Sequence, residues 1–291
     1  MPLLLDGKHC ADRIVDEIKT KVSQFSSSCD IKRRPPGLAF ILVGSHLASR
    51  SYLNMKRRRC REAGFFSVDR ELRESSSEEE LLAVIAELNA NPVIDGILIQ
   101  LPLPKGLRPL KMLQAVDPSK DVDGFHPLNV GKLLLGEEDG FVPCTPLGIL
   151  RLLQEAKISP DGQRVVIVGR SNIVGKPLAA ALMQKKRGAN ATVTLAHTGT
   201  LHLVEVCRSA DILIAAMGSP GFITEKMVKE RVVVIDVGIN RVDGRLVGDV
   251  AFDEVAPKCR AITPVPGGVG PMTIAMLLEN TLLSYERCFK R

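Results

Sequence analysis

Apolar positions along the first half of the chain follow two alternating patterns. Between residues 14 and 25 the apolar side chains recur at the spacing of an amphipathic helix, whereas LAFILVG (38–44) is an unbroken apolar run typical of a buried strand. The same two patterns recur and predict helices at 49–63 and 77–90, the latter with a capping signal in SSSEEE, and strands near 68–72 and 96–101. Alternation of this kind predicts a parallel sheet covered by helices.

The second half repeats this alternation after a stretch of turn-forming segments, DPSKDVDGFHP and FVPCTP, and a helix expected at 147–155. An apolar strand, RVVIVG (164–169), runs into a helix expected to begin near 175–177. Three further parallel strands are expected, at 192–197, 211–218 and 232–238. A last helix is expected at 273–289 and should return to the first domain.

A chain of 291 residues is long for one hydrophobic core, because single cores stop growing near roughly 250 to 300 residues. We therefore expect two α/β domains with a cleft between them. One consists of 1–146 plus 272–291, and the other is a Rossmann-type domain at 147–271. No apolar run approaches the roughly 18 residues of a membrane helix, so no membrane association is expected.

Seven cysteines are spread along the chain without a CxxC pair, so neither a metal site nor a disulfide framework is predicted. A reducing, cytoplasmic location fits best. The formal charge of +6 permits nucleic-acid binding, but aromatic residues make up only 4% and no stacking motif is present. We therefore expect no nucleic-acid partner. The basic run at 56–61 is in itself typical of a solvated helix face.

The turn after the strand at 164–169 reads G-R-S-N-I-V-G and is a candidate phosphate-binding turn. Gly169 and Gly175 are further apart than in the G-x-G-x-x-G fingerprint, and Ser171 stands where the second glycine would be. The strand before it and the helix after it are the context in which backbone N–H groups bind a pyrophosphate. An ordinary strand-to-helix turn remains the alternative.

The end of the next strand indicates which dinucleotide is bound. An NAD site places a carboxylate there, but this chain has His197 and Thr198, and Arg170 in the turn can meet a 2′-phosphate. NADP is favoured as the cofactor. The segment HTGT lacks a second basic residue, which leaves NAD use open.

Tyr52 and Lys56 are four residues apart on an expected helix, so both side chains project from one face. Short-chain dehydrogenases use the same Y-x-x-x-K spacing beside a nicotinamide. In those enzymes the nucleotide turn precedes the pair, whereas here the pair precedes the turn at 169. This order argues against that class.

Seven motifs occur in a fixed order along nearly the whole chain: LVGSHLASRSYLNMK, DGILIQLPLP, KDVDGFHP, PCTPLG, VGRSNIVGKP, VIDVGIN and PVPGGVGPMT. This array resembles the bifunctional methylenetetrahydrofolate dehydrogenase/methenyltetrahydrofolate cyclohydrolase family. The resemblance implies oxidation of 5,10-methylenetetrahydrofolate with NADP, hydrolysis of the methenyl product to 10-formyltetrahydrofolate, and a homodimer. A non-catalytic folate-binding protein of the same fold is the remaining alternative.

The resemblance assigns the first-half residues to the folate. Lys56 would be the hydrolytic catalyst, Tyr52 would stack on the aminobenzoyl ring, and Gln100 would hydrogen-bond the lysine. A lysine with a lowered pKa can transfer protons, and we expect the neighbouring arginines and partial burial to lower that pKa. Asp123, rather than its rival Asp121, would anchor the pterin, and Ser49 would add a polar contact.

The resemblance also assigns a loop over the substrate and a set of cofactor contacts. The loop is PVPGGVGPMT, with Gly267, Gly268 and Pro271. The implied cofactor contacts are Gly169, Arg170, Ser171, Ile173, Val174, His197, Thr198 and Ile239. No histidine is expected to be catalytic. The dense arginine run at 57–59 is a hypothetical contact for the polyglutamate tail of cellular folates.

Overall fold

The computed structural model describes residues 1–27, 34–44 and 47–289 and divides into two compact units. We call them the large-sheet unit, which is Met1–Ala11, Leu133–Gly136 and Thr145–Thr273, and the small-sheet unit, which is Asp12–Lys132, Glu137–Cys144 and Ile274–Arg291. The helices with residues in both units are α1 (Gly7–Ser27), α5 (Pro127–Leu135), α6 (Cys144–Glu155) and α10 (Val269–Phe289).

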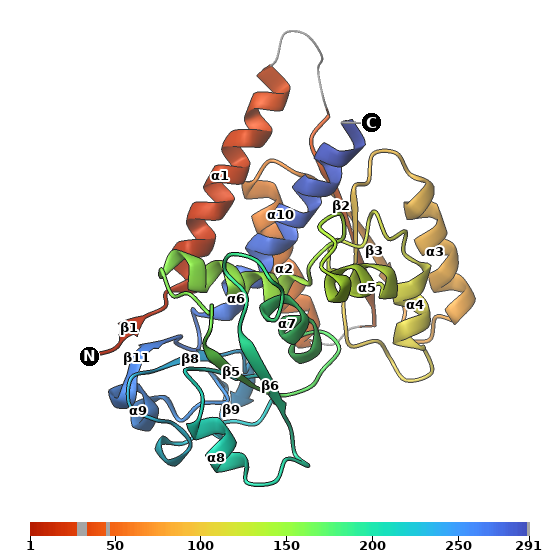
Figure 1. Cartoon of the computed structure of the whole chain (residues 1–291). Coiled ribbons are helices and arrows are strands. Elements are labelled where there is room, and N and C mark those ends of the chain that lie inside the picture. Colours follow the sequence, from red (N-terminus) through yellow and green to blue (C-terminus); the bar gives the residue numbers. More distant parts are fainter. Residues whose placement is uncertain (28–33, 45–46, 290–291) are drawn as a thin grey trace. The chain divides into compact units, whose positions relative to one another are not determined.

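The small-sheet unit is built on three parallel strands in the order β3–β2–β4, which are β3 (Phe66–Leu72), β2 (Gly37–Val43) and β4 (Gly96–Ile99) (Figure 1). Every residue of β2 is buried, which explains its unbroken apolar sequence. Ala39, Ile41 and Val43 belong to one core cluster with residues of α3 (Glu78–Ala90) and α4 (Pro109–Ala115). α2 (Leu47–Glu62) lies against β2 and β3.

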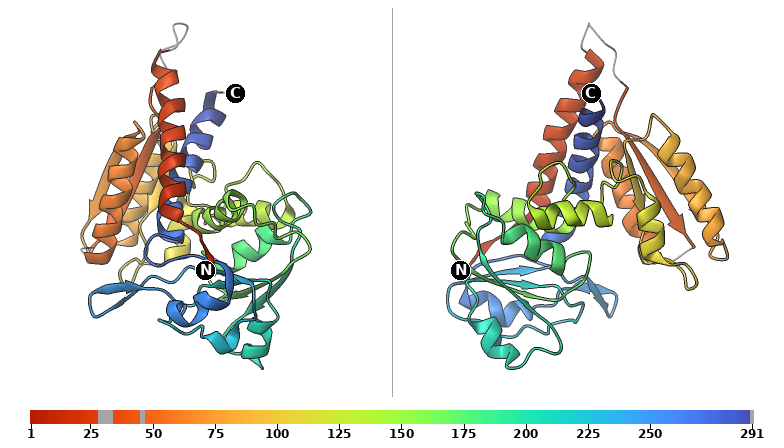
Figure 2. Two further views of the ribbon diagram at one scale, coloured as in Figure 1. Left: turned by 90° about the vertical axis from the view of Figure 1, so that its left-hand side faces the viewer. Right: turned by 45° about the vertical axis from the view of Figure 1, so that its right-hand side comes forward.

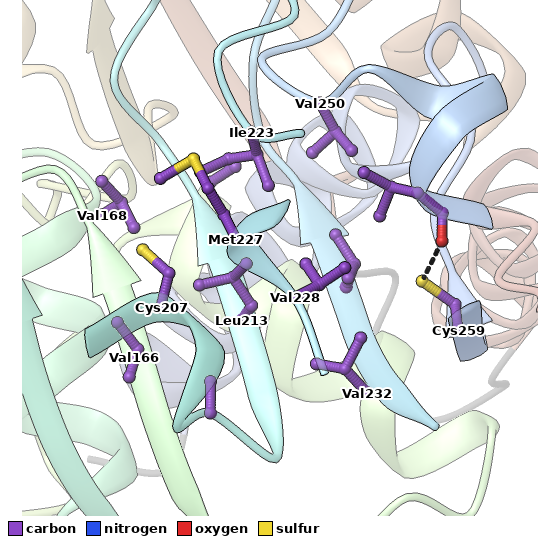
Figure 3. Packing of buried hydrophobic residues seen from close by; sticks show 14 of the residues in the cluster. Val166, Val168, Cys207, Leu213, Ile223, Met227, Val228, Val232, Val250 and Cys259 are labelled. Carbon is purple, nitrogen blue, oxygen red and sulfur yellow. Dashed lines mark hydrogen bonds between the residues drawn. The ribbon is translucent and has the colours of Figure 1, made fainter. Parts of the chain in front are cut away.

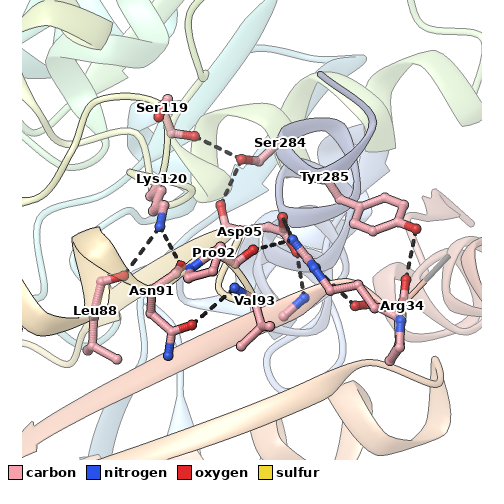
Figure 4. Close-up of polar contacts among 12 residues, drawn as sticks. Arg34, Leu88, Asn91, Pro92, Val93, Asp95, Ser119, Lys120, Ser284 and Tyr285 are labelled. Carbon is pink, nitrogen blue, oxygen red and sulfur yellow. Dashed lines mark hydrogen bonds and ion pairs between the residues drawn. The ribbon is translucent and has the colours of Figure 1, made fainter. Parts of the chain in front are cut away.

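The C-terminal part of α10 is tied into the small-sheet unit by polar contacts (Figure 4). The Ser284 hydroxyl donates to the carbonyl oxygens of Asp95 and Ser119, at 2.7 and 2.8 Å. The Tyr285 hydroxyl donates to the carbonyl oxygen of Arg34 at 2.8 Å. Arg34 in turn donates two hydrogen bonds to the buried Asp95 carboxylate, at 2.6 and 2.8 Å.

The large-sheet unit contains six parallel strands in the order β1–β11–β8–β7–β5–β6 (Figures 1 and 2). They are β1 (Leu3–Leu4), β5 (Arg164–Val168), β6 (Thr192–Ala196), β7 (Ile212–Ala215), β8 (Val232–Asp236) and β11 (Cys259–Ile262). The strands that follow β5 in the chain lie on both of its sides. This reversal is the topological switch point at which open α/β sheets bind ligands.

The remaining elements of the large-sheet unit are short: α7 (Gly175–Leu182), α8 (Leu203–Arg208), α9 (Phe252–Val255), the 3₁₀ turns at Glu225–Met227 and Ala256–Lys258, and an antiparallel hairpin of β9 (Asn240–Val242) and β10 (Arg245–Val247). Val166, Leu213 and Val234 from the sheet form a core cluster with Cys207 of α8 and Met227, part of which Figure 3 draws.

The α/β class expected from the alternating patterns is confirmed, and so is the cap of α3. The Ser77 hydroxyl accepts from Glu80 N, and the Glu80 carboxylate accepts from Ser77 N. Several elements were not foreseen. β1 and β11 have only two and four residues, α4 was not predicted, and α5 begins at Pro127, within a segment expected to form turns.

Replacing Asp95 by alanine should destabilise the small-sheet unit. Asp95 is 1% exposed and also accepts from Gly37 N, so the change removes the carboxylate that binds both the Arg34 guanidinium and a buried N–H. We expect a loss of about 3 kcal/mol, the low end for a broken buried pair, because Arg34 is partly exposed. Urea unfolding measures this, with the exposed Asp16→Ala on α1 as control. Equal stability of the two variants would contradict the role given to Asp95.

Candidate functional site

The small-sheet unit holds a lysine that is almost fully withdrawn from water. The Lys56 side chain on α2 is 5% exposed, and its Nζ donates to Gln100 Oε1 at 3.1 Å. Burial lowers the pKa of Lys56 below its ordinary 10.5, and the nearby Asp123 carboxylate partly opposes this. The ammonium is therefore unusually easy to deprotonate.

The expectation that the arginine run lowers this pKa is wrong. Arg57 binds the carboxylates of Asp69 and Glu71, at 2.8 and 3.0 Å. Arg59 donates to Glu62 at 2.9 Å and also pairs with Asp12. These carboxylates neutralise the guanidinium groups locally, and burial is the main cause of the lowered pKa.

Tyr52 and Gln100 fix the direction in which the Lys56 ammonium points. Nζ lies 4.6 Å from the centre of the Tyr52 ring one helical turn away, as the four-residue spacing predicted. Gln100 directly follows β4, and its Nε2 donates to the Leu101 carbonyl oxygen at 2.7 Å. That bond fixes the amide with its oxygen towards Lys56, so the expected hydrogen bond between Gln100 and the lysine is present.

Asp123 completes this group of side chains. Burial raises the pKa of its carboxyl, and the Lys56 ammonium and the Cys144 thiol oppose the rise. Cys144 was not foreseen as a neighbour. Its thiol donates to the Val122 carbonyl oxygen at 3.3 Å, and its own pKa is raised by burial.

The rival carboxylate, Asp121, accepts hydrogen bonds from the turn that it belongs to and from the helix that follows. It accepts from His126 N and from Asn129 Nδ2, both at 2.8 Å, and from Phe125 N at 3.2 Å. The turn is held further by Asn280 on α10, which donates to the Val122 carbonyl oxygen at 2.8 Å. Asp121 therefore shapes the turn that carries Asp123.

The large-sheet unit contains a pocket of about 340 Å³ at the carboxyl ends of β5, β6 and β7, as the switch point requires. Five of the expected cofactor residues line it: Gly169, Arg170, Ser171, His197 and Thr198. The pocket is also lined by residues that were not foreseen: Val168, Leu203, Ala216, Met217, Ser219 and Phe222. The end of β7 is predictable in hindsight, because the switch-point rule places it beside β5.

Backbone geometry in this pocket suits a ligand that approaches closely. Gly169 has φ +128°, and a Cβ there would lie 2.1 Å from the Ala216 carbonyl oxygen, so only glycine fits. The Ser171 hydroxyl accepts from Val174 N at 3.1 Å, next to the first turn of α7. A strand end, a glycine turn and a helix start are the combination that holds the pyrophosphate of a dinucleotide.

The other expected site residues do not line this pocket. Val174 directly precedes α7, and the side chains of Ile173 and Ile239 are exposed by 41% and 59%. Gly267, Gly268 and Pro271 lie in the large-sheet unit, where Lys8 N donates to the Gly267 carbonyl oxygen. The side chain of Ser49 lies outside the described part of the structure.

The described residues contain neither a membrane-spanning helix nor a cluster of metal-binding side chains. Within 1–27, 34–44 and 47–289, no helix combines the length and apolar character needed to cross a membrane. The same residues contain no group of three His, Cys, Asp or Glu side chains arranged to hold a metal ion.

Comparison with known proteins gives matches over almost the entire chain. Residues 5–123 match the catalytic domain of tetrahydrofolate dehydrogenase/cyclohydrolase, and residues 143–289 match the NAD(P)-binding domain of the same family. The bifunctional protein FolD of Protochlamydia amoebophila is 54% identical, and the alignment covers 98% of each chain.

Solved structures agree with these matches. The bifunctional FolD methylenetetrahydrofolate dehydrogenase/cyclohydrolase of Campylobacter jejuni has a TM-score of 0.95 at 47% identity and covers 99% of this chain and 100% of its own. The Trypanosoma brucei enzyme, solved with NADP and an inhibitor, has a TM-score of 0.93 at 35% identity and covers 100% of this chain and 99% of its own. The chain therefore belongs to the tetrahydrofolate dehydrogenase/cyclohydrolase family and is a bifunctional methylenetetrahydrofolate dehydrogenase and cyclohydrolase.

Proposed function

We propose that Lys56 transfers the protons of the cyclohydrolase step, with Gln100 and Tyr52 orienting it and Asp123 anchoring the pterin. The observation that carries this proposal is the buried Lys56 ammonium, whose Nζ donates to Gln100 and lies over the Tyr52 ring. A buried lysine with a lowered pKa gives up its proton more readily than an ordinary lysine and is therefore suited to proton transfer.

Hydrolysis begins when water adds to the methenyl carbon between N5 and N10 of the folate. Neutral Lys56 takes one proton from that water, while Gln100 Oε1 accepts one N–H and so leaves the nitrogen lone pair directed at the water. The bond from the carbon to N5 then breaks, and Lys56 returns its proton to N5. The second proton of the water is released as the formyl C=O forms, which gives 10-formyltetrahydrofolate and one proton.

Dehydrogenation makes smaller chemical demands on the side chains. When bound, NADP supplies the nicotinamide that accepts the hydride of the methylene carbon. The cation left behind is stabilised by its own two nitrogens, so the chain has only to position the reactants. Asp123 serves this purpose because one carboxylate accepts from both the 2-amino group and N3–H of the pterin. Hydrolysis needs no nucleotide, so the two activities should be separable by mutation.

The proposed preference for NADP over NAD rests on charge in the pocket. Arg170 and the uncharged Thr198 line it, and no carboxylate occurs among its lining residues. A guanidinium can bind a 2′-phosphate by charge-assisted hydrogen bonds, whereas NAD sites use an acid at this strand end.

We also propose that the arginine run contacts the polyglutamate tail of the substrate, chiefly through Arg58. The Arg58 side chain is 64% exposed and has one ion pair, to Glu62 at 3.4 Å, whereas Arg57 and Arg59 each bind two carboxylates. Arg58 is therefore the member of the run best able to accept a further carboxylate.

A homodimer and a reducing, cytoplasmic location complete the proposal. In the described part of the chain β3 pairs with β2 along one edge and with no strand along the other, which leaves an edge available to a second copy. The location is proposed because the seven cysteines are spread along the chain without a CxxC pair or a recognisable disulfide framework.

Lys56→Met should abolish hydrolysis while the folate still binds. The change removes the proton carrier and keeps an unbranched side chain, so we expect the hydrolysis rate to fall about 100- to 10,000-fold. Supplying methenyltetrahydrofolate directly and following its absorbance measures this step. Arg61→Met, at an exposed position on the same helix outside the 57–59 run, is the matched control. Wild-type hydrolysis by the Lys56 variant would rule out its proposed role.

Arg170→Ala should raise KM for NADP about 10- to 100-fold and leave KM for NAD nearly unchanged. A lost charge-assisted hydrogen bond costs about 1.5–3 kcal/mol, and NAD lacks the phosphate that receives it. Initial rates with each nucleotide give both values, and the exposed Arg187→Ala serves as control. Equal effects on both nucleotides would contradict the 2′-phosphate contact.

An Arg57/Arg58/Arg59→Ala variant should bind a long-tailed folate about fivefold more weakly, because exposed ion pairs contribute roughly 0.2–1 kcal/mol each. Titration with the monoglutamate form in the same variant separates tail binding from a change in the folate site. Unchanged affinity for the long-tailed form would refute the tail contact.

A further inference from the structure

Two aspartates of the large-sheet unit are buried without any role in the chemistry described so far. Asp236 ends β8, and Asp249 follows β10 by two residues; they are 4% and 0% exposed. Across residues 1–27, 34–44 and 47–289, no lysine or arginine forms an ion pair with either carboxylate. Buried carboxylates of this kind persist only if N–H donors replace water.

Asp249 obtains its donors from the segment that follows β7. Its Oδ2 accepts from Met217 N and Gly218 N, and its Oδ1 accepts from Ser219 N, each at 2.8 Å. Asn240 Nδ2 gives a fourth bond to Oδ1, also at 2.8 Å. Consecutive backbone N–H groups that converge in this way form an anion-binding nest. Here the anion is a side chain of the protein itself.

Asp236 holds Asp249 in place. Its Oδ1 accepts from Asp249 N at 2.9 Å, and its Oδ2 accepts from Val250 N at 3.0 Å. A Cβ at Gly248 would lie 1.8 Å from Asp236 Oδ2, so the approach of these two segments requires glycine there. The contacts run from β8 through Asp249 to the segment after β7.

That segment is one wall of the nucleotide pocket. Ala216, Met217 and Ser219 line the pocket, and the Ala216 carbonyl oxygen lies against Gly169 in the phosphate turn. The N–H groups of 217–219 are used by Asp249, so this wall has none of them left to offer a phosphate.

We propose that Asp249 is a positioning residue for the dinucleotide: it occupies the amide nest at Met217–Ser219 and so fixes the pocket wall beside Gly169, with Asp236 holding it there. The proposal rests on the NADP site proposed above. It assigns Asp249 to nucleotide binding and not to the hydrolytic step.

Asp249→Ala and Asp249→Asn test this assignment. The alanine variant leaves the three backbone N–H groups of 217–219 and the Asn240 amide without this acceptor. The asparagine variant keeps one acceptor oxygen at this position. We expect Kd for NADP, measured by calorimetry, to rise at least tenfold for alanine and by a smaller factor for asparagine. Hydrolysis of directly supplied methenyltetrahydrofolate should stay within twofold of wild type in both. Asp253→Asn, exposed on α9, is the control and should leave both readouts unchanged.

An unchanged Kd for NADP in Asp249→Ala would overturn the proposal. Parallel losses of NADP binding and hydrolysis in both variants would also overturn it, because they would indicate a general folding role. If the alanine variant does not fold, the asparagine variant alone decides between the same outcomes. A wild-type chain that fails to bind NADP would instead overturn the nucleotide site itself.

Discussion

The burial of the Lys56 ammonium is the constraint on which the hydrolytic step proposed for the small-sheet unit depends. Removing a charged amine from water is costly, and three neighbours limit that cost: the Gln100 oxygen, the Tyr52 ring and the field of Asp123. In the part of the chain that the structure describes, Lys56 forms no direct salt bridge. A tight ion pair would have held the proton on the lysine. The arrangement found instead leaves the proton easier to remove, which the hydrolytic role proposed for Lys56 requires.

The positions of these groups follow from the parallel sheet. Gln100 directly follows β4, so its place is set by a buried strand at one end of the sheet. Asp123 lies in a turn whose backbone is hydrogen-bonded by Asp121, Asn129 and Asn280. The large-sheet unit uses the same principle, since Asp236 and Asp249 fix the loops at its strand ends. In both units, buried polar side chains that bind the backbone shape the loops that present the functional residues.

Much of this arrangement could be predicted from the sequence, because the relevant signals are local. Hydrophobic periodicity predicted the main strands and helices, and the four-residue spacing placed Tyr52 beside Lys56. Other features depend on contacts between distant segments. Asp249 binds N–H groups about thirty residues earlier in the chain, and no spacing rule connects them. Burial was correctly expected to lower the Lys56 pKa, but the contribution expected from the arginines was wrong, because the sequence reveals adjacent arginines but not the carboxylates that neutralise them.

Titration of the Lys56 ammonium in the intact protein tests the central claim most directly. Labelling lysine with carbon-13 at Cε gives NMR signals from all the lysines, and the signal that disappears in Lys56→Met is that of Lys56. We expect a midpoint below 10.5, and a still lower one in Asp123→Asn, because the carboxylate that favours the charged form is gone. A midpoint at or above 10.5 in the wild type would contradict the account of Lys56 as a readily deprotonated catalyst.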